Sequence, residues 1–222
     1  VEELQVAGAW DRAGELLGDA AAELEAGGAE LLVLATNTMH KVADAIQART
    51  RIPLLHLGDT TASAVRAAQV HRVGLLGTAF TMEQDFYVDR LRSHGLDVVV
   101  PPAEDRAEVH RVIYDELCRG QVLDSSRDAY LEVIGRLADR GCTGIILGCT
   151  EIELLLPMAA AHGTPHDTWL RLDGHGVREP LVLREVTPDE ADRGTELAGT
   201  PAGHAAVDAV RSASNDWRRS SA

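Results

Sequence analysis

The sequence predicts an α/β protein built from two similar halves, and two observations support this prediction. Short apolar runs alternate with amphipathic helical patterns along the chain, which is typical of a parallel sheet covered by helices on both faces. In addition, residues 144–156 and 31–47 each have the pattern of a strand, a short polar turn and a helix. Two such units predict two pseudo-symmetric halves, with a site between them at the carboxyl ends of strands.

The turn of residues 144–156 is Cys149-Thr150-Glu151, between the apolar run 145–147 and a helical pattern. At a helix start the first backbone N–H groups lack intrahelical partners, and the helix dipole favours negative charge. We therefore expect the Cys149 thiol to ionise more readily than that of a free cysteine. The same N–H groups could hold a carboxylate.

The matching upstream turn is Thr36-Asn37-Thr38, so Thr36 takes the position that Cys149 has in the other unit. A hydroxyl is a weak base unless a neighbouring group accepts its proton. His40, four residues further on, is the nearest candidate in sequence.

The remaining segments follow the same alternation. Thr78 and Thr81 fall where a strand passes into a helix, and Thr81 with Glu83 could cap that helix. We expect one half to comprise residues 1–70 with 158–222, and the other residues 71–157. The periodicities predict strands at 52–57, 72–77 and 96–100, and helices from about 11 to 27, at 60–69, from 109 to 120 and at 126–140.

The composition argues against several classes of partner and cofactor. A net charge of −14 over 222 residues argues against nucleic acid or an anionic membrane as a partner, and no apolar run is long enough to span a bilayer. Three cysteines without metal-type spacing predict a reducing cytoplasm and no metal site. Lys41 is the only lysine, and a pyridoxal-phosphate enzyme needs a Schiff-base lysine, so we expect chemistry without a cofactor.

Four motifs carry a resemblance to a known family. ATNTMHK, PLLHLGDTT, GLLGTAFTME and LGCTEIELLLP, in this order, resemble the aspartate/glutamate racemases over about residues 10–157. The resemblance implies flavodoxin-like halves and two facing acid–base residues without a cofactor. Cys149 takes the second of these positions, and Thr36 takes the first, as in a subgroup similar to L-aspartate/glutamate-specific racemases. A strand and a glycine-rich loop that precede this region in the family are expected to be missing.

The resemblance also implies the reaction, which is removal and return of the α-proton of aspartate, glutamate or both. The expected partner is a dicarboxylic amino acid, and a homodimer is compatible with these features. Glu151 would orient the amine or only begin the helix, and Arg119 would bind the side-chain carboxylate or only complement the end of its helix. The expected site comprises Cys149 and Thr36 as catalytic residues and Asn37, Thr38, Thr78, Thr81, Thr150, Glu151 and Arg119 as substrate-binding residues.

Two other functions stay open. The wider superfamily includes decarboxylases and isomerases that use a single cysteine, and a truncated chain could bind an amino acid without turning it over. Residues 165–168 are similar to a strand-and-turn motif of the family, and residues 204–210 are similar to its closing helix. Residues 169–203, rich in Gly, Asp, Glu and Arg, match no segment of the family and are expected to form a loop or to be partly disordered.

Overall fold

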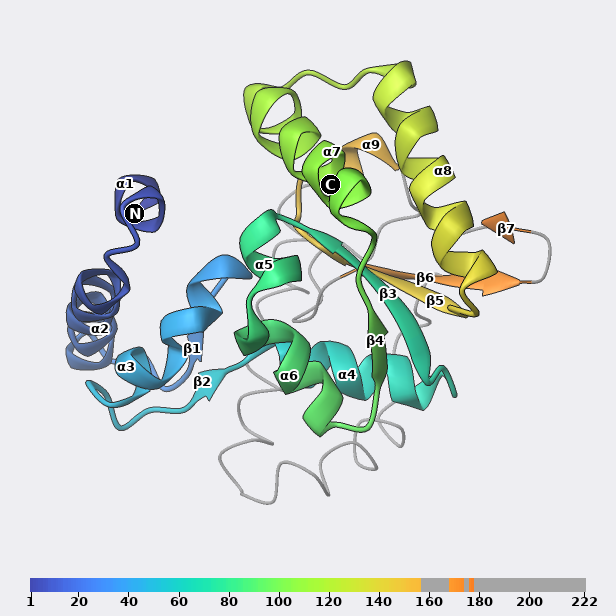
Figure 1. Ribbon diagram of the computed structural model, residues 1–222. Coiled ribbons are helices and arrows are strands. Elements are labelled where there is room, and N and C mark those ends of the chain that lie inside the picture. The colour runs from blue at the N-terminus through green and yellow to red at the C-terminus, as the bar shows by residue number, and fades with distance from the viewer. Residues whose placement is uncertain (157–167, 174–175, 178–222) are drawn as a thin grey trace, which may run out of the picture. The chain divides into compact units, whose positions relative to one another are not determined.

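The computed structural model describes residues 1–156, 168–173 and 176–177 (Figure 1). The chain divides into two compact units. One contains Val1–Leu32 and Asp44–Leu54, and the other contains Val33–Ala43 and the described residues from Leu55 onward. The boundary near residue 70 stays a prediction. The motifs expected at 165–167 and 204–210 lie outside the described residues.

The first unit is organised around α2 (Trp10–Ala26), which follows the short α1 (Glu2–Val6). The buried side of α2 is made of small residues, among them Gly18, where an added Cβ would lie 2.6 Å from Cγ of Arg49. Arg49 pairs with Asp19 on the same helix. This close approach explains why a glycine stands in the middle of a helix.

A five-stranded sheet forms the centre of the second unit, in the order β4-β3-β5-β6-β7 (Figure 1). β3 (Arg72–Gly77) lies between β4 (Asp97–Val99) and β5 (Gly144–Gly148), and both pairings are parallel. These strands confirm the predicted parallel arrangement. A separate two-stranded sheet joins β1 (Leu32–Val33) and β2 (Leu54–Leu55).

Both faces of the parallel strands are covered. Leu76, Ile145 and Leu147 belong to one apolar cluster with residues of α7 and α8. Leu75 and Ile146 are also fully buried, and as alternate positions along their strands they face the opposite side. Figure 1 shows α7 and α8 on one side of the sheet and α4 and α6 on the other.

The helices lie close to the predicted positions. Thr36-Asn37-Thr38 leads into the 3-10 helix η1 (Thr38–Val42), and α3 (Ala43–Gln47) continues it. The helices that follow are α4 (Leu57–Ala67), α5 (Ala79–Glu83), α6 (Asp85–Ser93), α7 (Ala103–Asp115), η2 (Leu117–Arg119), α8 (Asp124–Asp139) and α9 (Ile152–Leu155). No helix among the described residues is long and apolar enough to cross a membrane.

The sheet continues where the sequence analysis expects a loop. β6 (Thr168–Asp173) pairs antiparallel with β5, and β7 (Gly176–Val177) pairs antiparallel with β6. The expectation of a loop from residue 169 onward is therefore wrong for these two strands. β6 lies between β5 and β7, so backbone partners on both sides stabilise this short strand.

Candidate active site

Two of the predicted polar turns meet at one edge of the sheet. β3 and β5 are parallel and in register, with Gly77 opposite Gly148, so the residues that follow them, Thr78 and Cys149, leave neighbouring strand ends. An added Cβ on Gly77 would lie 3.0 Å from the carbonyl oxygen of Gly148. The two glycines thus allow the strand ends to approach closely just before the polar residues.

Hydroxyl–hydroxyl contacts connect the third turn, Thr36-Asn37-Thr38, to the same edge of the sheet. Oγ1 of Thr38 lies 3.3 Å from Oγ1 of Thr78, which in turn lies 3.2 Å from Oγ1 of Thr81. All three threonines are buried, and so is Asn37, whereas Thr36 is exposed. Residues far apart in the sequence are therefore brought together within one compact unit.

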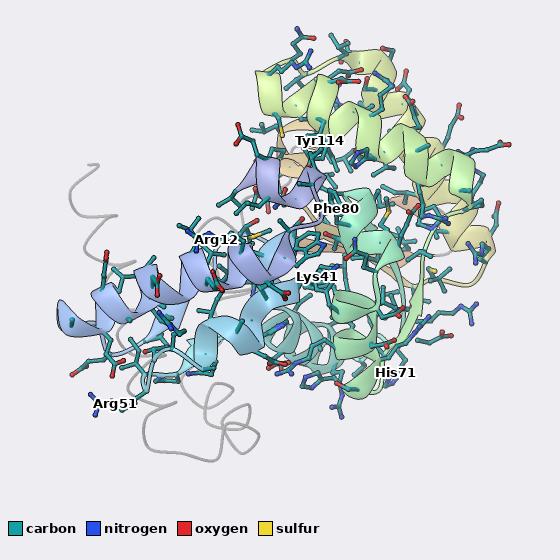
Figure 2. The ribbon with its side chains drawn as sticks, turned by 60° about the vertical axis from the view of Figure 1, so that its left-hand side comes forward. Arg12, Lys41, Arg51, His71, Phe80 and Tyr114 are labelled. Carbon is teal, nitrogen blue, oxygen red and sulfur yellow. The ribbon has the colours of Figure 1, made fainter. Side chains whose placement is uncertain are left out.

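Backbone N–H groups in the first turn of α5 donate hydrogen bonds to the Thr78 side chain and to a histidine of α7. Thr78, not Thr81, caps this helix, because Oγ1 of Thr78 accepts from the Thr81 N–H at 3.4 Å. Nδ1 of His110 accepts from the Ala79 N–H at 3.1 Å. Phe80 and Tyr114, both labelled in Figure 2, lie against His110, with the Tyr114 ring centroid 4.7 Å from that of His110. A substrate at this turn would therefore meet threonine hydroxyls rather than these two N–H groups.

Sequence reasoning does not place His110 in the site. The residue lies 31 positions from Ala79, and no local pattern connects the two. Its only signal is its place on the amphipathic helix whose apolar face packs toward the sheet.

Cys149 differs from the expectation in its ionisation. Its side chain is half-buried against the apolar cluster, and its S–H donates to Oε2 of Glu151 at 2.9 Å. Burial raises the pKa of Cys149 above its usual range. The hydrogen bond to Glu151 and the negative charge of Glu151 raise this pKa further, and the hydrogen bond from the Glu151 N–H offsets the rise only in part. The expectation of an easily ionised thiol is wrong, because burial and then the Glu151 carboxylate oppose the thiolate that the helix start alone would favour.

Glu151 is the negative member of this pair. Its Oε2 also accepts from the Thr150 hydroxyl at 2.9 Å. Burial acts to raise the pKa of Glu151, but hydrogen bonds from Cys149, the backbone and Thr150 outweigh it, so the pKa is lowered. The resting pair is therefore a thiol that donates to a carboxylate.

His40 contacts the Thr36 backbone instead of its hydroxyl. Nδ1 lies 2.9 Å from the carbonyl oxygen of Thr36, and Nε2 accepts from the Leu57 N–H at 3.1 Å. These partners assign the neutral tautomer with the proton on Nδ1. Both ring nitrogens are occupied, so His40 does not accept the Thr36 hydroxyl proton as the sequence analysis expects.

Arg119, the cation predicted to bind the side-chain carboxylate, lies at the end of η2 and is exposed. η2 packs against α9, and Arg119 pairs with Asp115 at 3.5 Å. Lys41 (Figure 2) donates from Nζ to Oε1 of Gln84 at 2.5 Å. Within the described part of the chain no group of three or more His, Cys, Asp or Glu side chains could hold a metal ion.

The chain is similar to known racemases and racemase homologues. A crystal structure of a candidate Asp/Glu racemase from Yersinia pestis is 42% identical, with a TM-score of 0.68 over 90% of this chain and 79% of that one. An aspartate racemase homologue from Pyrococcus horikoshii is 37% identical, with a TM-score of 0.60 over 66% of this chain and 64% of that one. A glutamate racemase from Pseudomonas paraeruginosa is 31% identical over 60% of this chain and 49% of its own length.

The match to the family as a whole covers most of the chain. The profile of the Asp/Glu/Hydantoin racemase family aligns with residues 1–166, which include all three polar turns. Because this match covers more than half of the chain, the chain belongs to the Asp/Glu/Hydantoin racemase family.

Proposed function

We propose that this chain racemises aspartate, glutamate or both, without a cofactor, by removing and returning the α-proton. The observation that carries the proposal is the meeting of the Cys149–Glu151 pair and the Thr38–Thr78–Thr81 hydroxyl chain at one sheet edge. The aspartate racemase homologue and the glutamate racemase among the similar proteins support this substrate class. The expected setting is the reducing cytoplasm, in keeping with three free cysteines.

The Cys149–Glu151 pair supplies the acid–base group for one face of the substrate. The Cys149 thiol passes its proton to the Glu151 carboxylate, which already accepts its hydrogen bond at 2.9 Å. The resulting thiolate takes the α-proton of the L-amino acid, and the electron pair that is left on the α-carbon is delocalised into the α-carboxylate. Hydroxyl groups of Thr38, Thr78 and Thr150, with the Asn37 amide, stabilise this charge.

The opposite face is served by Thr36. Its hydroxyl donates a proton to the α-carbon, which completes the D-enantiomer and leaves an alkoxide. The proton held by Glu151 returns to that alkoxide through water, so every group regains its starting state. Because an alcohol is a poor base, the return direction is the slower turnover, by about 100-fold or more for the loss of one good acid–base group. Arg119 is the proposed cation that binds the side-chain carboxylate of the substrate. To do so, its guanidinium leaves the surface ion pair with Asp115.

A second candidate rests on the protonated state of Cys149. A thiol with a raised pKa stays protonated near pH 7, and a single-cysteine decarboxylase needs a protonated group to protonate the carbanion that remains after loss of carbon dioxide. Such an enzyme would act on a malonate-type acid and would leave the α-proton of aspartate in place.

Incubation in deuterium oxide, followed by NMR, tests both candidates. A racemase replaces the α-proton of L-aspartate or L-glutamate with deuterium and forms the D-enantiomer. Cys149→Ala should abolish both signals, while Cys118→Ser, which removes an exposed thiol, should preserve them. Activity only on a malonate-type acid supports the decarboxylase. Binding of aspartate without exchange would overturn both and favour a non-catalytic binder.

A further inference from the structure

His40 has an unusual position for a histidine with no part in the proton transfers proposed above. It is 4% exposed and lies one turn beyond Thr36, on η1. Its two ring nitrogens hold two backbone groups that are 21 residues apart: Nδ1–H donates to the Thr36 carbonyl, and Nε2 accepts from the Leu57 N–H. One side chain thus fastens the Thr36 turn to the start of α4.

We propose that His40 is a positioning residue, which holds the Thr36 backbone so that the Thr36 hydroxyl reaches the substrate α-carbon. This inference rests on the proposed racemase function. It assigns to His40 no proton transfer, because both of its nitrogens already have backbone partners. Thr36 itself is exposed, and the hydrogen bond from His40 constrains the direction of its carbonyl group.

The surroundings of His40 favour the neutral ring, which the hydrogen bonds with both Thr36 and Leu57 require. The His56 ring lies edge-on, with its centroid 4.3 Å from that of His40. Burial, the largest influence, lowers the pKa of His40; the Thr36 and Asn37 backbone and Asp59 act in the opposite direction, while Arg90 also lowers it. The ring therefore stays neutral near pH 7, and Nε2 remains free to accept from Leu57.

The two contacts can be separated by amide side chains of different length. His40→Asn places an N–H near the position of Nδ1 and can keep the bond to Thr36, but does not reach Leu57. His40→Gln places an oxygen near the position of Nε2 and can keep the bond from Leu57, but leaves the Thr36 carbonyl without its donor. His56→Asn is the matched control, because it alters the neighbouring ring and retains a capping acceptor for Gly58.

The activity readout compares two products formed from L-aspartate in deuterium oxide. It is the ratio of D-aspartate, the product of inversion, to α-deuterated L-aspartate, the product of exchange with retention. Retention needs only the Cys149–Glu151 pair, whereas inversion also needs Thr36. His40→Gln should lower this ratio about tenfold, since a small misplacement of a reacting group is costly, whereas His40→Asn and His56→Asn should leave it near the wild-type value. Equal loss of inversion and retention in both His40 variants would overturn the proposal, because that is the effect of general destabilisation.

A second measurement does not depend on activity. In the ligand-free protein, the ¹⁵N NMR spectrum should show His40 neutral with its proton on Nδ1, and the ¹³C carbonyl signal of Thr36 should move in His40→Gln but not in His40→Asn. A proton on Nε2, or a Thr36 signal that moves equally in both variants, refutes the positioning role. Absence of α-proton exchange in the wild-type protein, with these NMR results obtained, would instead refute the racemase function and leave the contact established.

Discussion

Replacement of Glu151 by glutamine should make Cys149 more reactive toward an alkylating reagent. The carboxylate accepts the Cys149 S–H at 2.9 Å, and its hydrogen bond and charge both act to raise the thiol pKa. A hydrogen bond to a charged group contributes about 1.5–3 kcal/mol, and one pKa unit corresponds to about 1.4 kcal/mol. The pKa of Cys149 should therefore fall by about 1–2 units in Glu151→Gln, although burial keeps it above that of a free cysteine.

The expected gain in rate is smaller than the gain in thiolate. Between 10- and 100-fold more thiolate forms at a given pH, but thiolate nucleophilicity falls with pKa with a coefficient of roughly 0.5, so alkylation should accelerate about 3- to 10-fold. Iodoacetamide labelling at pH 7.5 with mass-spectrometric readout of each cysteine measures this, and labelling of Cys118 gives an internal reference. Glu153→Gln removes the same charge two residues further along and should leave the rate unchanged. Slower or unaltered labelling of Cys149 in Glu151→Gln would refute the pairing.

Three further outcomes follow from the structure. Because the Cys149 proton passes to Glu151 within the protein, kcat/KM for α-proton exchange from L-aspartate should be nearly constant from about pH 6 to about pH 8.5; a tenfold rise per pH unit would mean that the thiol deprotonates to solvent. Burial, with the neighbouring His40, lowers the pKa of His56 from 6.5 to about 4, so the stability that depends on the neutral ring is fully present above pH 6.5 and is lost as the pH falls toward 4. Because the ring is partly exposed, solvent screening limits this loss to about 1–2 kcal/mol; chemical unfolding should show it, and His56→Asn should flatten the dependence. Gly77→Ala places a Cβ 3.0 Å from the Gly148 carbonyl oxygen and should lower the free energy of unfolding by about 1–3 kcal/mol; an unchanged denaturation midpoint would show that the strand ends can separate.

Sequence periodicity was sufficient for the elements that bury a complete face. The run Arg72–Gly77 is the observed β3, and Gly144–Gly148 is β5, because a central parallel strand must be apolar on both sides. β6 was not predicted: Leu170-Arg171-Leu172-Asp173 alternates as a strand does, but so short a run gives a weak signal until its pairing with β5 is known.

The site was predictable in its residue types but not in its electrostatics. The polar turns could be located because each follows a strand, yet the ionisation state of Cys149 depends on its burial and on the direction of the Glu151 side chain. A local rule for helix starts predicts a thiolate, and burial together with the carboxylate contact overrides that rule. The roles of His40 and His110 depend on contacts with backbone groups at Leu57 and Ala79, which no spacing rule connects.

The most direct test of the proposed mechanism is the fate of L-aspartate in deuterium oxide with Thr36 replaced. The account predicts that Thr36→Ala still deuterates the α-carbon with retention but forms little D-aspartate, and that Thr36→Cys forms D-aspartate faster than the wild-type protein, because a thiol is the better acid–base group. If Thr36→Ala keeps full racemisation and Thr36→Cys changes nothing, the second face is not served by Thr36 and the two-face mechanism is contradicted.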